Sequence, residues 1–146
     1  MEHTKETPRP EKARTIGLQQ AEYLLSVTRL GQLPADSGAE VAMAGRSNVG
    51  KSSVLNRVCQ QRALARVSRT PGRTQALNFF ILGSPEQRLV DLPGYGYAKV
   101  PEAMRAQWGE LLSQYLRSRQ SLKGLILVMD IRHPLMPFDC DLLRFA

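Results

Sequence analysis

The spacing of apolar residues changes along the first half of the chain, and each change predicts a secondary-structure element. Residues 16–30 carry leucine, alanine and valine at mostly helical spacing before a cluster of glycine, proline, aspartate and serine, which predicts one amphipathic helix followed by a linker. Residues 41–44 form a short apolar run that ends in glycines, and residues 51–61 return to helical spacing. A strand, a glycine-rich loop and a helix are therefore expected in succession.

The second half of the chain predicts a hairpin, a helix and one further strand. Residues 76–82 and 87–92 are typical of strands, and the Gly-Ser-Pro turn between them predicts a hairpin. A helix is expected from Pro101 onward, because the apolar residues after it recur at helical spacing. Residues 124–130 form a continuous apolar run, which predicts a strand buried on both faces. Helical spacing begins again at residues 137–146.

Length and composition fit one globular domain. The chain has 146 residues, of which 42% are hydrophobic and 23% charged, and a domain usually contains roughly 100–200 residues. The pattern divides it into a disordered tail at residues 1–14, a helix and linker at residues 15–38, and the main domain at residues 39–146. The two cysteines lie far apart and outside any metal-binding cluster, so we expect a reducing cytoplasm. The longest strongly apolar run, residues 125–129, is too short for a membrane span, which needs roughly 20 apolar residues.

Positive charge is concentrated in one interval of the sequence. The net charge is +7, and no acidic residue occurs between Glu40 and Glu86, where seven basic residues match the whole net charge. These are Arg46, Lys51, Arg57, Arg62, Arg66, Arg69 and Arg73. Such a run suits a polyanionic partner such as a nucleic acid or a nucleotide phosphate, and it is equally typical of a solvated basic face.

Residues 45–52 read GRSNVGKS and match the phosphate-loop pattern GxxxxGK[ST]. Glycines let the backbone wrap closely around a polyphosphate with its N–H groups pointing inward. Lys51 would reach the outer phosphates, and Ser52 would offer its hydroxyl to Mg²⁺ at the start of the helix, where the helix dipole favours an anion. The pattern lies between a predicted strand and a predicted helix, as a phosphate loop requires, and this disfavours a chance match.

Two further segments could complete a nucleotide site. Residues 91–94 read DLPG at a predicted strand end, where Asp91 would hold Mg²⁺ through water and the Gly94 amide would contact a γ-phosphate. Alone, this pattern is as typical of an ordinary Pro-Gly turn. Residues 68–75 form a basic loop with Thr70 and Thr74, either of which could complete the Mg²⁺ shell when the γ-phosphate is present; a flexible basic loop without this role is the alternative.

Four strings together resemble the EngB family of bacterial GTPases, also called the YihA or YsxC family, within the Era-like branch. They are GRSNVGKSS, SRTPGRTQ, VDLPGYGYAKV and LVMDIRHPLMPFD, and the match runs from about Tyr23 to the C-terminus. The resemblance implies an α/β, three-layer P-loop NTPase fold of the Ras-like type, with residues 39–146 as a partial GTPase domain. It also implies GTP and GDP as ligands, Mg²⁺ as cofactor, and a monomeric cytoplasmic switch without membrane attachment. The implied partners are the large ribosomal subunit and its rRNA during assembly, and the implied cellular role includes normal cell division and septation.

The resemblance carries particular roles over to residues of this sequence. Lys51 and Thr74 would serve catalysis, and Ser52 and Thr74 would ligate Mg²⁺, with Thr74 rather than Thr70 as the second ligand. The residues expected to contact the nucleotide come from the three motif segments. They are Gly45, Arg46, Ser47, Asn48, Val49, Gly50, Lys51, Ser52, Gly72, Arg73, Thr74, Gln75, Ala76, Asp91, Leu92, Pro93 and Gly94.

The residue after Gly94 predicts slow intrinsic hydrolysis. Many small GTPases have a water-orienting glutamine there, whereas this chain has Tyr95, which cannot orient the attacking water in the same way. Activation is then expected from contact with the ribosome or from K⁺ held near Asn48, and an ordinary loop asparagine is the alternative for Asn48.

No Asn/Thr-Lys-x-Asp motif, which would read the guanine base, occurs in these 146 residues. In EngB-like proteins that motif lies C-terminal to the matched region, so a C-terminally truncated member with missing strands and helices is expected. This absence leaves turnover of GTP by the chain open. It also keeps two alternatives: a basic RNA- or ribosome-binding P-loop module without productive turnover, and an ATP-using P-loop enzyme.

Overall fold

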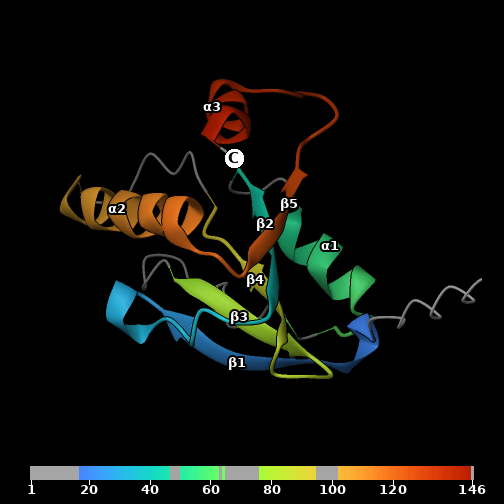
Figure 1. The fold of residues 1–146 in the computed structure, drawn as a ribbon. Coiled ribbons are helices and arrows are strands. Elements are labelled where there is room, and N and C mark those ends of the chain that lie inside the picture. The colour runs from blue at the N-terminus through green and yellow to red at the C-terminus, as the bar shows by residue number, and fades with distance from the viewer. Residues whose placement is uncertain (1–16, 47–49, 63, 65–75, 95–101, 146) are drawn as a thin grey trace, which may run out of the picture.

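The computed structural model describes residues 17–46, 50–62, 64, 76–94 and 102–145, which form a five-stranded sheet with helices on both faces (Figure 1). The strands are β1 (Ala21–Val27), β2 (Ala39–Gly45), β3 (Leu77–Leu82), β4 (Gln87–Asp91) and β5 (Leu122–Val128). The helices are α1 (Lys51–Val58), α2 (Glu102–Ser118) and α3 (Pro137–Phe145), with short 3-10 turns η1 (Leu18–Gln20) and η2 (Leu30–Gln32). The predicted strand at residues 41–44, the hairpin, and the helices after residues 50, 101 and 136 are confirmed.

The sheet is mixed, with strand order β1-β3-β4-β2-β5. β4, β2 and β5 are parallel, whereas β3 is antiparallel to both β1 and β4. The parallel strands are connected through helices, and their carboxyl ends meet at one edge of the sheet, the usual place for a ligand site in α/β folds. The order and the alternation with helices confirm the predicted α/β class.

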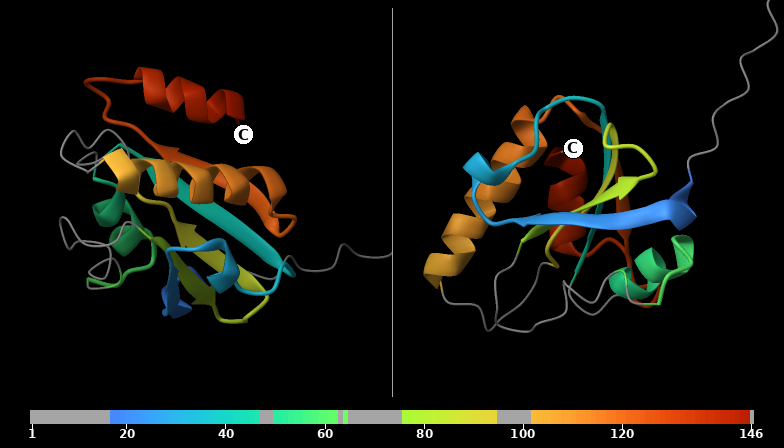
Figure 2. Two further views of the ribbon diagram at one scale, coloured as in Figure 1. Left: turned by 90° about the vertical axis from the view of Figure 1, so that its left-hand side faces the viewer. Right: turned by 90° about the horizontal axis from the view of Figure 1, so that it is seen from below.

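Two apolar clusters fill the space between the sheet and its helices. Leu55 of α1 and Cys59, directly after the helix, pack against Met43, Phe80 and Leu89 on one face. On the other face, α2 contributes Leu111 and Tyr115, which pack with buried side chains of β2, β3 and β4, and α3 adds Leu142 at the margin of the same cluster. Figure 2 shows α1 and α2 on opposite sides of the sheet, with α3 on the side of α2. The two faces are called below the α1 face and the α2 face.

The helix predicted over residues 16–30 is wrong, because this segment forms β1 as a strand of the same sheet. A β-bulge between Tyr23 and Leu25 changes the phase of side-chain alternation. Ala21 therefore packs on the α1 face, whereas Leu25 and Val27 pack on the α2 face. The bulge removes the regular two-residue period and leaves apolar spacings that mimic a helix. The tail predicted at residues 1–14 lies outside the described residues.

The prediction that the last strand is buried on both faces is also wrong. Every residue of β5 is half-exposed or exposed, and the Ile126 side chain is 46% exposed. Within the described residues β5 pairs only with β2 and stands at the end of the strand order, so it lacks cover along its outer side. No helix in the described part of the chain is long and apolar enough to cross a membrane.

Candidate phosphate-binding site

The loop between β2 and α1 ends in a backbone geometry suited to an anion. Gly50 precedes α1 with a φ of 89°, a left-handed conformation that glycine adopts without strain. Apart from its chain neighbours and the backbone of α1, no heavy atom of the described residues lies within 4 Å of the position a Cβ would take. The N-cap residue of α1, Gly50, has no side chain that could accept a hydrogen bond from the N–H groups of the helix. The first N–H groups of a helix need acceptors from outside the helix, and a phosphate can supply them.

Lys51, the first residue of α1, extends from this loop to the end of β4. Its ammonium group forms an ion pair with the Asp91 carboxylate and donates a hydrogen bond to the Leu92 carbonyl oxygen. The Asp91 side chain is buried, with 1% exposed, and the Lys51 side chain is half-buried, with 11% exposed. Two motifs that lie 40 residues apart in the sequence thus meet at one point.

The parallel pairing of β2 and β4 produces this meeting. Met43 lies directly opposite Asp91, and the Leu92 N–H donates to the Met43 carbonyl oxygen over 2.9 Å. The phosphate loop starts at Gly45, two residues after Met43, so both predicted segments leave the sheet side by side.

The structure describes part of the predicted site. Gly45 is the last residue of β2, Arg46 is half-buried beside it, and Ser52 is half-buried in the first turn of α1. After β4, Leu92 and Pro93 are buried and Gly94 is half-buried, and Ala76 is buried directly before β3. Other residues predicted for the site or for its regulation lie outside the described residues: Ser47, Asn48, Val49, Gly72, Arg73, Thr74, Gln75 and Tyr95.

The chemistry of the described residues fits a magnesium-bound phosphate. Ser52 and Asp91 offer hard oxygen ligands of the kind Mg²⁺ prefers, and Mg²⁺ usually takes its other ligands from phosphate and water. Among the described residues, no group of three or more His, Cys, Asp or Glu side chains forms a metal-binding cluster of their own. The Lys51 ammonium and the helix N-terminus suit the anionic oxygens. A phosphate that bound Lys51 would compete with Asp91 and the Leu92 carbonyl for the same three N–H donors.

Sequence reasoning missed a row of polar side chains that runs toward Asp91. Asn78 on β3 is 5% exposed and lies directly opposite Asp91 on β4 and Ser26 on β1. The Ser26 hydroxyl donates to the Asn78 side-chain oxygen over 2.6 Å, and the Tyr23 hydroxyl lies 2.6 Å from the Ser26 hydroxyl. A signal was present, because Asn78 is the polar residue in the otherwise apolar strand LNFFIL.

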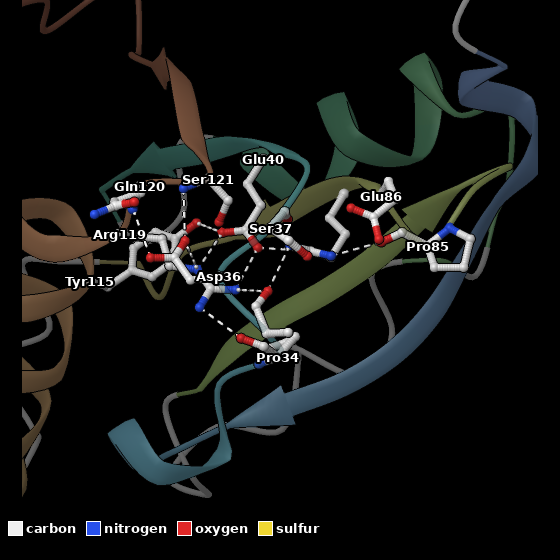
Figure 3. A network of polar contacts seen from close by, with 12 residues as sticks. Pro34, Asp36, Ser37, Glu40, Pro85, Glu86, Tyr115, Arg119, Gln120 and Ser121 are labelled. Atoms are coloured by element: carbon white, nitrogen blue, oxygen red, sulfur yellow. Dashed lines mark hydrogen bonds and ion pairs between the residues drawn. The ribbon is translucent and has the colours of Figure 1, made fainter.

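A second buried carboxylate, Glu40, lies at the opposite, amino-terminal end of β2 (Figure 3). Arg88 donates to it over 2.7 Å, Arg119 donates to both of its oxygens over 2.9 and 3.0 Å, and Tyr115 donates over 3.0 Å. Burial by itself raises the pKa of Glu40, but the hydrogen bonds from Arg119 and Arg88 outweigh it and hold the pKa below the ordinary value. Burial, with the Glu40 charge beside it, raises the pKa of Tyr115.

Backbone carbonyls fix the two arginines of this cluster. They accept the remaining guanidinium N–H groups and belong to Pro34, Ala35, Ser37 and Pro85. Nearby, Asp36 accepts hydrogen bonds from Ser121 and Gln120, which lower its pKa to about 2. The charged side chains of this cluster pair within the protein, which is typical of a structural anchor between α2 and the sheet.

Comparison with known proteins adds a family to this geometry. A family model described as "50S ribosome-binding GTPase" matches residues 40–146. A "Probable GTP-binding protein EngB" from Stenotrophomonas maltophilia (strain K279a) is 58% identical over 129 residues, which cover 88% of this chain and 64% of that protein. A protein of the same name from Xylella fastidiosa (strain 9a5c) is 57% identical over 129 residues, with 88% and 63% covered. The chain thus spans a little under two thirds of the length of these relatives.

Proposed function

Since this chain belongs to the EngB family within the 50S ribosome-binding GTPases, we propose that it binds GTP and GDP with Mg²⁺ at the carboxyl end of β2 and β4 and hydrolyses GTP slowly. The observation that carries this proposal is the meeting of Lys51 with Asp91 and the Leu92 carbonyl beneath the N-terminus of α1. A cation, a carboxylate and the N-terminus of a helix converge there, as recognition of a magnesium-bound polyphosphate requires.

Each predicted residue has a role in this proposal. Residues 45–52 wrap the phosphates with their backbone N–H groups, and Lys51 contacts the outer phosphates. Ser52 and Thr74 ligate Mg²⁺, Asp91 holds it through water, and residues 72–76 contact the nucleotide. The Gly94 amide contacts the γ-phosphate. When bound, Mg²⁺ neutralises charge on the phosphates, and the protein's own groups orient them.

Hydrolysis is proposed to be slow without an activator. Tyr95 follows Gly94 where many small GTPases have a glutamine, so the chain has no side chain there that orients the attacking water. Contact with a ribosomal particle, or K⁺ held near Asn48, would supply the missing acceleration.

The proposed partner is the large ribosomal subunit during its assembly, bound through rRNA. The basic interval of the sequence supports this, and Arg57 and Arg62 are exposed in its described part. In this proposal the role in cell division and septation is indirect, because both depend on the supply of ribosomes. The chain is proposed to act as a monomer in the cytoplasm. A mutant with normal ribosome profiles and failed septation would count against the indirect route.

Titration with fluorescent GTP and ATP analogues in Mg²⁺ tests the proposal. We expect GTP to bind more tightly than ATP, and Lys51→Ala to weaken GTP binding about 10- to 100-fold, because a charged hydrogen-bond donor is lost. Lys123→Ala, which removes an exposed lysine from β5, is the matched control and should bind like wild type. Binding that survives Lys51→Ala would overturn the proposed site.

Equal affinity for the two nucleotides would favour a second candidate, a basic RNA- or ribosome-binding P-loop module without productive turnover. The observation behind this candidate is that no Asn/Thr-Lys-x-Asp motif occurs in the 146 residues.

A further inference from the structure

We propose that Asn78, held by Ser26, is a positioning residue that orients the Asp91 carboxylate for Mg²⁺. The inference rests on the proposed function and assigns a role to side chains outside the three motifs. Its basis is the row of polar side chains that runs from Tyr23 through Ser26 and Asn78 to Asp91.

Strand register places these side chains on one face of the sheet. Ser26 lies opposite Asn78, and Asn78 lies opposite Asp91. Directly opposed residues on neighbouring strands point to the same face. That face is the α1 face, because Phe80, two residues after Asn78, packs with Leu55 of α1, and Lys51 reaches Asp91 from the same helix. The row therefore ends at the candidate phosphate site.

The β-bulge in β1 is what brings a hydroxyl to Asn78. Tyr23 lies opposite Phe80, and unbroken pairing from there would place Leu25 opposite Asn78. The extra residue, Leu24, shifts the register so that Ser26 takes that position and Leu25 turns to the α2 face. A leucine at this point would leave the buried amide of Asn78 without the hydrogen bond it now receives.

The direction of the hydrogen bonds fixes the orientation of the amide. The single hydroxyl proton of Ser26 is donated to the Asn78 side-chain oxygen, so the Tyr23 hydroxyl donates to Ser26. Edge-to-face packing on Phe80, with ring centroids 6.0 Å apart, holds the Tyr23 ring. The Asn78 oxygen is thereby committed to β1, and its amide nitrogen, which carries two donors, is left for the β4 side. A carboxylate is an acceptor without donors, so Asp91 and the Asn78 amide are chemically matched.

Orientation of Asp91 matters because one carboxylate has to serve two groups. It is the ion-pair partner of Lys51, and in the proposed function it also holds the hydrated Mg²⁺. In the proposed role the Asn78 amide donates to the Asp91 carboxylate, which would restrain the carboxylate without neutralising its charge. Loss of this donor should weaken the binding of Mg²⁺ more than it weakens the binding of the nucleotide.

The test measures how Mg²⁺ slows the release of a fluorescent GDP analogue, with EDTA as the Mg²⁺-free reference. We expect Asn78→Ala to raise the half-effective Mg²⁺ concentration about tenfold, the effect of losing the one charge-assisted hydrogen bond that the proposal assigns to the Asn78 amide. Release in EDTA should stay within about twofold of wild type, because the Lys51 and backbone contacts are intact. Ser26→Ala should shift the Mg²⁺ dependence in the same direction by about threefold, and Ser26→Thr, which keeps the hydroxyl, should restore the wild-type value.

The outcomes separate the two proposals. Wild-type protein that shows no Mg²⁺-dependent nucleotide binding overturns the proposed function and the positioning role with it. A wild-type Mg²⁺ dependence that Asn78→Ala retains overturns the positioning role alone. If Asn78→Ala does not fold, the pair Ser26→Ala and Ser26→Thr decides: equal Mg²⁺ dependence in the two variants overturns the inference, and a difference supports it.

Discussion

The two ends of the sheet each bury a carboxylate against basic side chains, and the two arrangements differ in how firmly they are held. At the amino-terminal end of β2, Glu40 accepts hydrogen bonds from Arg88, Arg119 and Tyr115, and backbone carbonyls hold both arginines (Figure 3). At the carboxyl end of β4, Asp91 has the ammonium of Lys51 as its ion-pair partner. Several hydrogen bonds hold each arginine of the Glu40 cluster, whereas Lys51 carries its point charge at the end of an unbranched side chain.

The difference between arginine and lysine explains why these ends suit different tasks. A guanidinium presents its donors in a fixed planar fork, so two arginines with carbonyl partners permit one geometry. A lysine side chain can turn its ammonium from a carboxylate to a phosphate without a change in the backbone. The Glu40 end therefore anchors α2 to the sheet, and the Asp91 end can exchange partners when a ligand binds.

The largest expected effect comes from breaking the Glu40 end. Glu40→Gln removes the charge that balances Arg88 and Arg119, and the loss of one partner of a buried ion pair costs about 3–5 kcal/mol. Denaturant unfolding should show this loss in the free energy of unfolding. Glu110→Gln, an exposed position on α2, is the matched control and should unfold like wild type. A loss below about 1 kcal/mol, the worth of a surface ion pair, would contradict the anchoring role.

A substitution at the Asp91 end should lower the free energy of unfolding less than one at the Glu40 end, and it should weaken Mg²⁺ binding more. Asp91→Asn removes the ion-pair partner of Lys51, and we expect a loss of about 1–3 kcal/mol because the lysine keeps the Leu92 carbonyl as an acceptor. The Mg²⁺ dependence of nucleotide release should be lost. The same unfolding and release assays measure both effects, with Asp141→Asn on the exposed side of α3 as control. A destabilisation as large as that of Glu40→Gln would remove the contrast between the two ends.

The smallest expected effect is a pH dependence at the rim of the Glu40 cluster. Hydrogen bonds from Ser121 and Gln120 lower the pKa of Asp36 from 3.8 to about 2 in the folded protein. The ionised Asp36 carboxylate therefore stabilises the folded protein fully above the pKa of the unfolded chain, near 4. This stabilisation is lost as the pH falls toward about 2. Asp36→Asn should flatten this acid limb in unfolding curves recorded at several pH values. An unchanged acid limb would show that Asp36 contributes nothing to it.

Local patterns in the sequence predicted the phosphate loop, and the structure places Lys51 of that pattern against Asp91. Eight consecutive residues define the loop, and a strand before it with a helix after it restricts the path of the backbone. The Glu40 cluster has no comparable signal, since its arginines lie 48 and 79 residues from Glu40 and follow no motif. Asn78 stood out only as one polar residue in an apolar strand, and nothing in the sequence named its neighbour on β1.

The sequence by itself determined the family and the α/β class, and it predicted a phosphate loop, because these depend on residue types at fixed local spacing. Only the tertiary structure decided that residues 21–27 form a strand and that Ser26 faces Asn78. Strand pairing, sheet position and the phase shift at a bulge depend on residues far away in the chain, and periodicity within one segment does not encode them.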